Sequence, residues 1–515
     1  MRLSSLLSAL PRDLEPTAYV RSSPDVDPVI RGVSYDSRKV SPGDLFVAVR
    51  GAVSDGHEFI DRALEQGAAA VLVEEAPAAP MLGACPAVVV PDTRRALAPI
   101  ARLFFGDPAS ELTLVGITGT NGKTSTTYLV ESILAAADQR VGLIGTVDIR
   151  YAGETIPSVN TTPESLDLQR TLRNMRTAQI EAVVMEVSSH GLELGRVAGC
   201  RFRVAAFTNL TQDHLDFHGD MDAYGESKAK LFSDHVVPGG TAVVNVDDPS
   251  AGRFMEAARA GGARVLRCSR QSDTAAEVRL LDSEIELSGS RVRLALPSGE
   301  LTVELPLVGD FNLENLIVAC GVAEAVGTPP EAIAAGVAAC PQVPGRMEVV
   351  RVDKPGAPVV IVDYAHTPDA VDKLLAAVRP LCSGRMITVF GCGGDRDRAK
   401  RPLMAEAVAR HSDVAIATSD NPRTESPTAI LEDVVAGLGS MRECELKELG
   451  EGENEYAVVE DRRAAIMTAV RAAHSADTVV IAGKGHEDYQ IVGREKLPFD
   501  DREEARRALG LRTQP

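Results

Sequence analysis

Short apolar runs separated by helical stretches dominate the middle of the chain. They predict strands at residues 112–117, 140–146, 180–187, 202–207 and 241–246. Amphipathic stretches with helical spacing lie between several of these runs. Strands that alternate with helices form parallel sheets, whose ligands bind beyond the carboxyl ends of the strands. The middle of the chain is therefore predicted to be an α/β domain with a mostly parallel sheet and a site at those ends.

The same alternation returns in the last third of the chain. Apolar runs predict strands at 359–363, 386–390, 414–417 and 479–482, and residues 367–379 predict a helix. The last three strands are followed by residues rich in glycine, Asp, Asn, Arg and Glu. This pattern predicts a second α/β domain, Rossmann-like, that also carries polar groups at its strand ends.

A smaller α/β domain is predicted at the start of the chain. A Pro42-Gly43 turn precedes the apolar run 45–49, and a helical stretch then leads to a second run at 70–73. The breaker cluster Gly106-Asp107-Pro108 follows these elements. We therefore expect the first domain to end near residue 107.

A second boundary is expected at the Pro344-Gly345 turn, which gives three predicted domains with the bounds 1–107, 108–344 and 345–515. Within the central domain, residues 276–308 alternate between apolar and polar positions. This alternation is typical of antiparallel strands with one solvated face. The predicted fold class is α/β, with three domains.

Composition narrows the class of protein. The 515 residues carry a net charge of −19, and 44% of them are hydrophobic. An acidic balance disfavours nucleic-acid binding as the main task. The eight scattered cysteines form no Cys-x-x-Cys pair, which indicates reduced thiols, and no apolar run approaches the roughly 18 residues of a membrane helix. We expect a cytoplasmic protein, without nucleic-acid binding as its main task and without membrane insertion.

A glycine-rich loop links the first central strand to a helical stretch. Backbone N–H groups of such a loop and the helix N-terminus bind phosphate, so the central domain is predicted to be a P-loop-type fold. Lys123 would reach the β- and γ-phosphates of a nucleotide, and the Thr124 hydroxyl would bind Mg²⁺. The glycine spacing departs from the usual P-loop, and a turn that only caps the helix is the alternative. The loop residues are Gly119, Thr120, Asn121, Gly122, Lys123, Thr124 and Ser125.

Candidate metal ligands follow two other central strands. Glu186 closes an apolar run, where a carboxylate can hold Mg²⁺ against nucleotide phosphates, and a solvated surface glutamate is the alternative. His214 and His218 have the i, i+4 spacing of a zinc pair on a helix. No Glu follows His214 directly and no third ligand has metal spacing, so zinc is disfavoured.

The strand ends of the last domain offer groups suited to a zwitterion. Arginine binds a carboxylate with its planar fork, and a carboxylate pairs with an ammonium group. The candidate residues are Arg396, Asp420, Asn421, Arg423, Gly483 and Glu487. Arg346, in the turn before this domain, is a candidate phosphate contact, with a plain exposed arginine as the alternative.

Several motifs, in order along the whole chain, resemble the Mur ligase family, whose superfamily also includes folylpolyglutamate synthetases. They are Tyr-Asp-Ser-Arg at 35–38, Thr-Gly-Thr-Asn-Gly-Lys-Thr at 118–124, Gly-Asp-Phe-Asn-Leu-Glu-Asn at 309–315 and Asp-Asn-Pro-Arg at 420–423. The last motif resembles members that add meso-diaminopimelate, because lysine-adding relatives lack this arginine.

The resemblance implies a role for each matching residue. ATP would contact the loop residues 119–125 together with Asn312, Asn315 and Arg346, and Mg²⁺ would be held by Thr124, Glu186, His214 and Lys228. By pattern alone Lys228 is a surface lysine, whereas the resemblance implies that CO₂ converts it to a carbamate. Lys123, Lys228 and His214 would be catalytic. The uridine-nucleotide substrate would contact Ser37, Asn160, Thr161, Thr162, Ser188 and Arg196.

The implied activity is ATP-dependent ligation in peptidoglycan precursor synthesis. The substrates would be UDP-N-acetylmuramoyl-L-alanyl-D-glutamate and meso-diaminopimelate, joined through an acyl phosphate. Arg396, Asp420, Asn421, Arg423, Gly483 and Glu487 would bind the amino acid, with Arg423 at its distal carboxylate. Three alternatives remain at this point: a folylpolyglutamate synthetase, a P-loop kinase and a non-enzymatic nucleotide switch.

Overall fold

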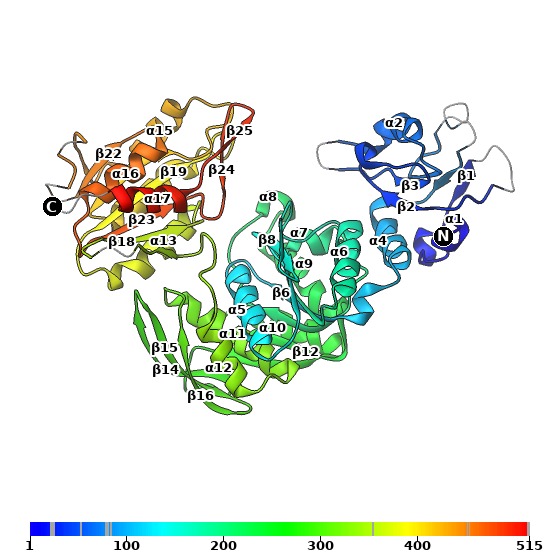
Figure 1. Ribbon diagram of the computed structural model, residues 1–515, viewed down its shortest axis with the longest axis horizontal. Coiled ribbons are helices and arrows are strands. Elements are labelled where there is room, and N and C mark those ends of the chain that lie inside the picture. Colours follow the sequence, from blue (N-terminus) through cyan, green and yellow to red (C-terminus); the bar gives the residue numbers. More distant parts are fainter. Residues whose placement is uncertain are drawn as a thin grey trace. The chain divides into compact units, whose positions relative to one another are not determined.

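The computed structural model contains three sheet-bearing α/β domains (Figure 1). It describes residues 1–20, 26–51, 54–77, 82, 85–352, 355–446, 448–450, 452 and 454–511. The predicted α/β fold class is confirmed. Two compact units divide the chain: unit 1 holds Met1–Leu281, Leu294–Leu301 and Asn315–Gly336, and unit 2 holds Asp282–Arg293, Thr302–Glu314 and Val337–Pro515.

The first domain is a five-stranded sheet in the order β1-β5-β4-β3-β2. β1 runs antiparallel to β5, and the other neighbours are parallel. β3 and β4 are buried along their whole length, and apart from Asp44 at the start of β3 their residues are apolar. The elements are α1 (Leu3–Leu7), β1 (Ala18–Val20), β2 (Gly32–Ser34), η2 (Ser37–Lys39), β3 (Asp44–Val47), α2 (Ile60–Glu65), β4 (Ala70–Val73), β5 (Ala87–Val89) and α4 (Thr93–Phe104).

The central sheet is built around β6, which lies between β11 and β10. In unit 1 the order is β13-β12-β11-β6-β10-β7-β8-β9, and the strands from β13 to β7 are parallel. This arrangement brings the carboxyl ends of β6, β10 and β11 to one edge. The strands are β6 (Thr113–Thr118), β7 (Val141–Ile144), β8 (Asp148–Tyr151), β9 (Glu154–Pro157), β10 (Ala182–Glu186), β11 (Phe202–Phe207), β12 (Val236–Asn245) and β13 (Arg264–Ser269).

Helices connect these parallel strands, as the sequence pattern predicts. A strand that pairs with a parallel neighbour needs a crossover connection, and α5, α6 and α9 with α10 supply such crossovers. The helices are α5 (Lys123–Ala136), α6 (Ser165–Thr177), α7 (Ser189–Glu193), α8 (Leu215–His218), α9 (Met221–Asp234) and α10 (Ala251–Ala260).

The predicted alternation at residues 276–308 forms three strands, β14 (Val278–Glu286), β15 (Gly289–Leu296) and β16 (Gly299–Leu305). Each is a hydrogen-bonded neighbour of the next. Two-residue turns join them, and such turns connect antiparallel neighbours. The chain then continues through α11 (Phe311–Val326) and α12 (Pro330–Ala338).

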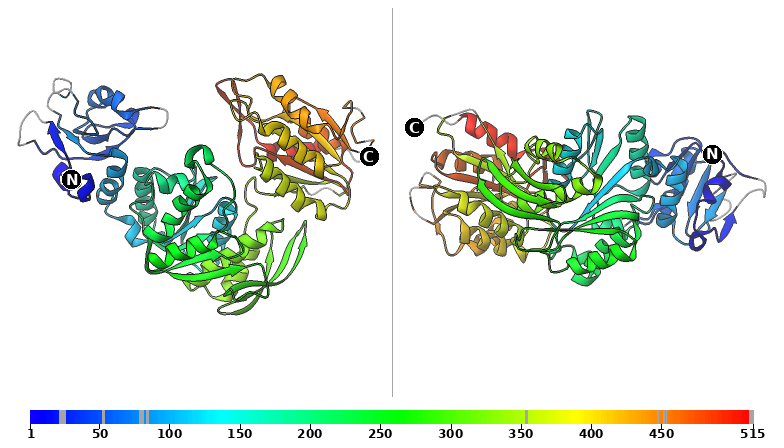
Figure 2. Two further views of the ribbon diagram at one scale, coloured as in Figure 1. Left: turned by 180° about the vertical axis from the view of Figure 1, so that it is seen from behind. Right: turned by 90° about the horizontal axis from the view of Figure 1, so that it is seen from below.

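The last domain is a doubly wound sheet in the order β17-β18-β23-β19-β20-β22-β21. All neighbours are parallel except β17 and β18. One face packs against α13, α14 and α15, and the other against α16 and α17 (Figure 2). The strands are β17 (Glu348–Val350), β18 (Val359–Asp363), β19 (Met386–Cys392), β20 (Val414–Ser419), β21 (Arg442–Glu443), β22 (Glu455–Val458) and β23 (Thr478–Ala482).

A separate hairpin completes this domain. β24 (Tyr489–Val492) and β25 (Glu495–Pro498) pair antiparallel with each other. The helices of the domain are α13 (Pro368–Val378), α14 (Lys400–His411), α15 (Pro427–Val435), α16 (Arg462–Ala472) and α17 (Asp501–Leu511). None of the helices in the described ranges combines the length and apolar content needed to cross a membrane.

Candidate active site

The glycine-rich loop lies between the end of β6 and the start of α5, as predicted. Gly122 is the N-cap of α5 and has φ +83°, a left-handed conformation that glycine adopts without strain. A Cβ at Gly119 would stand 1.9 Å from Thr208 Oγ1, and a Cβ at Gly122 would stand 2.1 Å from Asn315 Oδ1. Both positions therefore require glycine, because neighbouring side chains fill the space.

Residues after β11 hold the loop from the other side. The Thr208 hydroxyl donates to Asn121 O at 2.6 Å, and the Asn121 N–H donates to Asn209 Oδ1 at 2.9 Å. Thr120 Oγ1 donates to Thr211 O at 3.1 Å. Such a network fixes backbone N–H groups before a phosphate arrives. Sequence reasoning assigned Thr208, Asn209 and Thr211 no role.

Two lysines converge on one carbonyl oxygen of the loop. Lys123 Nζ donates to Gly119 O at 2.9 Å and to Thr120 O at 2.8 Å. Lys228, on α9, donates to the same Gly119 oxygen at 2.8 Å, and its Nζ lies 4.4 Å from the centroid of the Tyr224 ring. The fold therefore brings together two residues that are 105 positions apart in sequence, Lys123 and Lys228.

Lys228 is a buried lysine, although its pattern is that of a surface residue. Only 1% of its surface is exposed. Burial, with a smaller contribution from the charge of Lys123, lowers the pKa of Lys228 well below its ordinary value, and Asp213 opposes that shift. A lowered pKa favours the neutral amine, which is the form that reacts as a nucleophile.

Glu186 is wholly buried at the carboxyl end of β10. Its Oε1 accepts a hydrogen bond from Thr146 N at 2.8 Å, and its Oε2 accepts one from Thr146 Oγ1 at 2.9 Å. A carboxylate oxygen has a second lone pair, so both oxygens can still bind a cation. Thr124, at the start of α5, is also buried and adds a hydroxyl at the neighbouring strand end. A carboxylate and a hydroxyl beside a phosphate loop suit Mg²⁺.

Three histidine rings cluster beyond these strand ends. The His190 ring meets the His214 ring edge to face, with centroids 4.8 Å apart, and lies 5.5 Å from the His218 ring. His218 Nε2 lies 3.0 Å from Ser189 Oγ. Burial lowers the pKa of all three imidazoles, whereas the Asp213 carboxylate opposes this shift at His214 and the Glu193 carboxylate opposes it at His218. No group of three or more His, Cys, Asp or Glu side chains among the described residues has metal-binding geometry.

The residues predicted to contact the nucleotide-linked substrate form a network with Glu186. Thr162 Oγ1 donates to Glu186 O at 3.0 Å and lies 3.1 Å from Ser188 Oγ. Thr161 Oγ1 lies 3.0 Å from Thr146 Oγ1, which itself bonds to Glu186. The fold thus joins the predicted substrate segment to the predicted metal ligand.

Three further predicted substrate residues are arranged differently. Arg196 donates to Thr162 O at 3.0 Å and forms an ion pair with Glu164 at 2.9 Å, so it lies beside the same segment. Asn160 is exposed in the turn after β9. Ser37 is buried at the start of η2, in the first domain.

The predicted nucleotide contacts outside the loop lie on two elements. Asn312 and Asn315 are three residues apart on α11, hence on one face of the helix. Asn315 Oδ1 lies 3.5 Å from Thr126 Oγ1 of α5, which places this side chain against the loop. In unit 2, the Arg346 guanidinium stacks over the Tyr364 ring at 4.8 Å, and its Nε is buried without a hydrogen-bond partner in the described residues.

The amino-acid pocket predicted in the last domain is assembled from the ends of β20 and β23. Asn421 Nδ2 donates to Glu487 Oε2 at 3.0 Å, so these two predicted residues are in direct contact. Arg423 has φ +52° and donates to Gly394 O at 2.8 Å. Arg396 follows β19, is exposed and bonds to Asp395 O at 3.1 Å. Gly483 has φ +122°, and its N–H donates to Asp363 O at 3.1 Å.

A residue that sequence reasoning missed lies at the centre of this pocket. The Lys484 side chain is wholly buried and bonds to Asp420, Asn421 and Glu487. The available signal was its place in Gly-Lys-Gly directly after an apolar strand. Lysine is rarely buried unless it is paired, so a pattern alone does not identify it.

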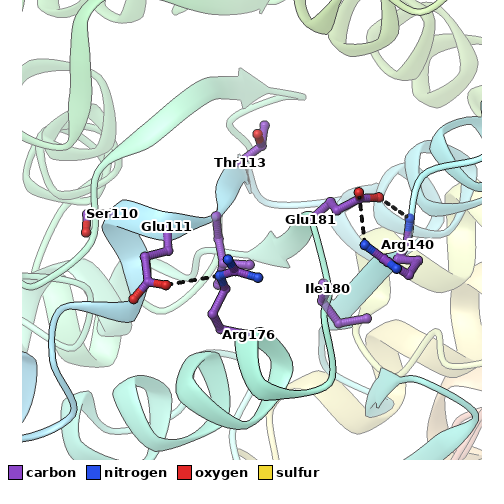
Figure 3. Close-up of a pocket in the computed structure, with 8 residues that line it drawn as sticks. Ser110, Glu111, Thr113, Arg140, Arg176, Ile180 and Glu181 are labelled. Atoms are coloured by element: carbon purple, nitrogen blue, oxygen red, sulfur yellow. Dashed lines mark hydrogen bonds and ion pairs between the residues drawn. The ribbon is translucent and has the colours of Figure 1, made fainter.

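One cavity of the central domain lies away from the candidate active site. It has a volume of about 470 Å³ and is lined near the amino ends of the parallel strands, by residues such as Thr113, Arg140 and Glu181 (Figure 3). Its arginines are paired, Arg140 with Glu181 and Arg176 with Glu111, each at 3.1 Å. Because ligands of parallel sheets bind at the carboxyl ends, this cavity is separate from the candidate site.

The central domain has a mostly parallel sheet with a phosphate-binding loop, and the last domain has a doubly wound sheet. Together they define a nucleotide-binding α/β protein. Three family models match consecutive parts of the chain. They are described as Mur ligase family, catalytic domain, at residues 29–105; Mur ligase middle domain, at 117–323; and Mur ligase, glutamate ligase domain, at 345–485.

Relatives that share one name match almost the whole chain. The UDP-N-acetylmuramoyl-L-alanyl-D-glutamate–2,6-diaminopimelate ligase of Gloeobacter violaceus is 47% identical over 514 residues, 99% of each chain. That of Geobacter metallireducens is 46% identical over 489 residues, 93% of this chain and 94% of the relative. A solved structure of a ligase of this name is 36% identical, with a TM-score of 0.67, and covers 93% of this chain and 95% of its own. The chain belongs to the Mur ligase family, which confirms the predicted resemblance.

Proposed function

We propose that the protein is an ATP-dependent ligase of peptidoglycan precursor synthesis, which joins meso-diaminopimelate to UDP-N-acetylmuramoyl-L-alanyl-D-glutamate. Relatives that carry this name are 46% and 47% identical over nearly the whole chain. Membership of the Mur ligase family disfavours a P-loop kinase and a nucleotide switch. The Asp-Asn-Pro-Arg segment and the matching first domain disfavour a folylpolyglutamate synthetase.

One observation carries the choice of amino acid. Arg423 and Glu487 belong to one hydrogen-bonded set of residues, linked through Asn421 and the β24–β25 hairpin. An arginine and a carboxylate in one pocket match an amino acid that presents both an ammonium group and an additional carboxylate. Diaminopimelate has that second carboxylate, and lysine does not. A lysine substrate would leave Arg423 unpaired, which costs binding energy.

The first step is phosphoryl transfer. A free carboxylate is a poor acyl donor, so the D-glutamate γ-carboxylate attacks the γ-phosphorus of ATP, an oxygen–phosphorus bond forms, and ADP leaves. Lys123 neutralises charge that develops on the transferring group. The N–H groups of residues 119–125 and the α5 N-terminus bind the ATP phosphates, with Asn312, Asn315 and Arg346 as further nucleotide contacts.

The donors beside the loop fit Mg²⁺, which supplies positive charge next to the phosphates when bound. Thr124 and Glu186 would hold one ion, and His214 and Lys228, the latter as a carbamate, would support a second. The lowered pKa of Lys228 supports the carbamate, because only the neutral amine adds to CO₂. Thr146 holds the Glu186 carboxylate in place through its N–H and its hydroxyl.

The second step forms the amide. The neutral amine of diaminopimelate attacks the acyl carbon and a carbon–nitrogen bond forms. Phosphate leaves with the electron pair of the broken carbon–oxygen bond, and one proton of the nitrogen passes to the departing phosphate. Arg423 would bind the distal carboxylate of the amino acid, and Glu487 its ammonium group, with Arg396, Asp420, Asn421 and Gly483 around them. On the other substrate, Ser37, Asn160, Thr161, Thr162, Ser188 and Arg196 would contact the uridine-nucleotide portion.

We further propose domain bounds of 1–107, 108–344 and 345–515, with the three domains binding the uridine nucleotide, ATP and the amino acid. A reaction that consumes ATP supports a cytoplasmic location, and we propose a monomer. Hydrolysis of the acyl phosphate would consume ATP without forming the product, so exclusion of water from the central site is part of the proposal.

The experiment is a phosphate-release assay with three arms. ATP, Mg²⁺ and the UDP-muramoyl dipeptide are supplied with diaminopimelate, with lysine, or with no amino acid. We expect release that depends on diaminopimelate and far exceeds release with lysine. Phosphate release at the same rate with and without diaminopimelate, or faster release with lysine, would refute the proposed substrate. A folate substrate in place of the UDP-muramoyl dipeptide tests the remaining relative, and turnover with it would refute the proposal.

A further inference from the structure

Lys484 is the most buried cation of the amino-acid pocket. It follows β23, and none of its side chain is exposed to solvent. Its Nζ lies 3.4 Å from Asp420 Oδ1, 3.1 Å from Asn421 Oδ1 and 3.1 Å from Glu487 Oε2. An ammonium group has three N–H donors, and here each has an acceptor. Lys484 is therefore committed to the protein and is not a ligand of the substrate.

These bonds determine how the neighbouring groups face. Asn421 Oδ1 accepts from Lys484 and from Ile491 N, the latter at 2.9 Å, so its Nδ2 points to Glu487 Oε2 at 3.0 Å. Glu487 Oε2 thus accepts from both Lys484 and Asn421. Among the described residues, no hydrogen bond goes to Glu487 Oε1. That oxygen is the one available to a substrate ammonium.

The charge of Lys484 also balances two carboxylates. Asp420 and Glu487 both approach its Nζ. The neighbouring buried cation, Arg462, forms a bidentate pair with Asp501, with both N···O distances 2.7 Å. Arg462 is therefore already matched. Without Lys484, two carboxylates would share a buried region with less positive charge, and repulsion would turn the Glu487 side chain away.

We propose that Lys484 is a positioning residue that determines amino-acid affinity by holding Glu487 and Asn421 in their binding orientation. The inference rests on the proposed function, because it assigns Glu487 to the ammonium group of diaminopimelate. This role of Lys484 differs from that of Arg423, which would bind the distal carboxylate and so select between amino acids. Lys484 sets the affinity and leaves the chemistry of the phosphoryl transfer unchanged.

The test compares Lys484→Met with Lys496→Met in the full-length enzyme. Lys496 is an exposed lysine of the same domain, on β25, with its Nζ 3.5 Å from the Tyr489 ring centroid. For Lys484→Met we expect the KM for diaminopimelate to rise at least about tenfold, since hydrogen bonds to charged groups are lost. The KM values for ATP and the UDP-muramoyl dipeptide should stay within about twofold, as should every KM of Lys496→Met. An unchanged KM for diaminopimelate in Lys484→Met would overturn the inference.

A double-mutant cycle separates positioning from a general structural role. If Lys484 acts through the bonded pair of Glu487 and Asn421, loss of the Glu487 charge removes most of its contribution. Lys484→Met/Glu487→Gln then has a KM for diaminopimelate close to that of Glu487→Gln alone, whereas losses that add would overturn the inference. In the double variant the Glu487 carboxylate is replaced as well, so the buried repulsion that could prevent Lys484→Met from folding is removed. Its KM can then still be compared with that of Glu487→Gln. Wild-type enzyme that shows no diaminopimelate-dependent phosphate release refutes the proposed function instead, which distinguishes the two failures.

Discussion

The central domain and the last domain each bury a lysine, and the two lysines have opposite surroundings. Lys228 is 1% exposed and Lys484 is 0% exposed. Lys228 donates to a peptide carbonyl and is repelled by Lys123, so its pKa lies well below its ordinary value. Lys484 faces the carboxylates of Asp420 and Glu487. Burial is equal at the two sites, so the partners decide what each amine can do.

The difference matches the proposed roles. A lysine that is to react with CO₂ must lose its proton, and desolvation next to another cation favours that loss. A lysine that is to hold carboxylates must keep its charge, which requires acceptors around every N–H. Under the proposed function, the central site would carry out a chemical step common to all amino acids, and the last domain would select among them.

Of the substitutions considered, replacement of Lys123 should lower the activity most, and it affects the central site. We expect Lys123→Ala to lower kcat by about 10³-fold, because charge on the transferring phosphoryl group is no longer neutralised. The loss should be the same with any amino acid that the enzyme accepts, as measured by phosphate release. Lys230→Ala, an exposed lysine paired with Glu193, is the control. A loss confined to diaminopimelate would contradict the separation of the two sites.

Replacement of Arg423 should affect the use of diaminopimelate, through the pocket of the last domain. We expect Arg423→Lys to lower kcat/KM for diaminopimelate by about 10²-fold, because an ammonium group cannot reproduce a bidentate carboxylate contact. The KM for ATP should not change. Arg410→Lys, at an exposed position on α14, is the matched control. An unchanged kcat/KM for diaminopimelate would remove Arg423 from its proposed role.

A smaller effect is expected from Thr146→Val, which removes the hydroxyl that bonds to Glu186 Oε2 but keeps the backbone bond to Oε1. Groups that orient a metal ligand contribute to affinity, so the Mg²⁺ concentration for half-maximal activity should rise roughly tenfold. Mn²⁺ binding with ADP present, followed by electron paramagnetic resonance, gives a second measurement. Thr155→Val, at an exposed position on β9, is the control. Equal metal affinity in both variants would show that Thr146 is not needed.

The smallest effect concerns the stability of the CO₂-free protein. The folded-state pKa of Lys228 lies well below its ordinary value of 10.5, so unfolding takes up a proton between those two pH values. Stability is therefore lost as the pH falls from 10.5 towards the folded pKa. We expect Lys228→Met to raise Tm by about 2–4 °C at pH 7, which corresponds to about 1 kcal/mol.

Two features of that measurement test the cause. The gain in Tm should shrink as the pH rises towards 10.5, because the lysine then loses its proton in the unfolded chain as well. Lys230→Met, where the side chain is 41% exposed, should show no such gain. A gain that does not vary with pH would mean that packing, and not the charge of Lys228, explains the difference.

Much of the central site could be predicted from the sequence because it is local. Strand β11 has the predicted bounds 202–207, and β10, predicted at 180–187, spans Ala182–Glu186. The phosphate loop lies between a strand and a helix, and the order of the strands follows from the alternation. The start of β12 was placed too late: Gly239 and Gly240 indicate a turn by composition, yet the strand begins at Val236.

The remainder depends on contacts between distant residues. The β8–β9 hairpin has little apolar alternation, so its residues alone do not predict it. Thr146 lies just after β7, and only the parallel pairing of β7 with β10 brings it to Glu186. Lys484 reaches Asp420 across 64 positions of sequence. Such partners are visible only once the sheet order is known.

The β24–β25 hairpin and the Asp-Asn-Pro-Arg loop are held together by backbone bonds. Arg423 N donates to Ile491 O at 3.0 Å, and Gly493 N donates to Arg423 O at 2.7 Å. Arg423 sits at φ +52° within this pairing. Protein engineers who wish to change the amino acid of such a ligase should therefore treat the two segments as one transplantable module. A donor loop moved without its own hairpin would lose the backbone template that aims its arginine.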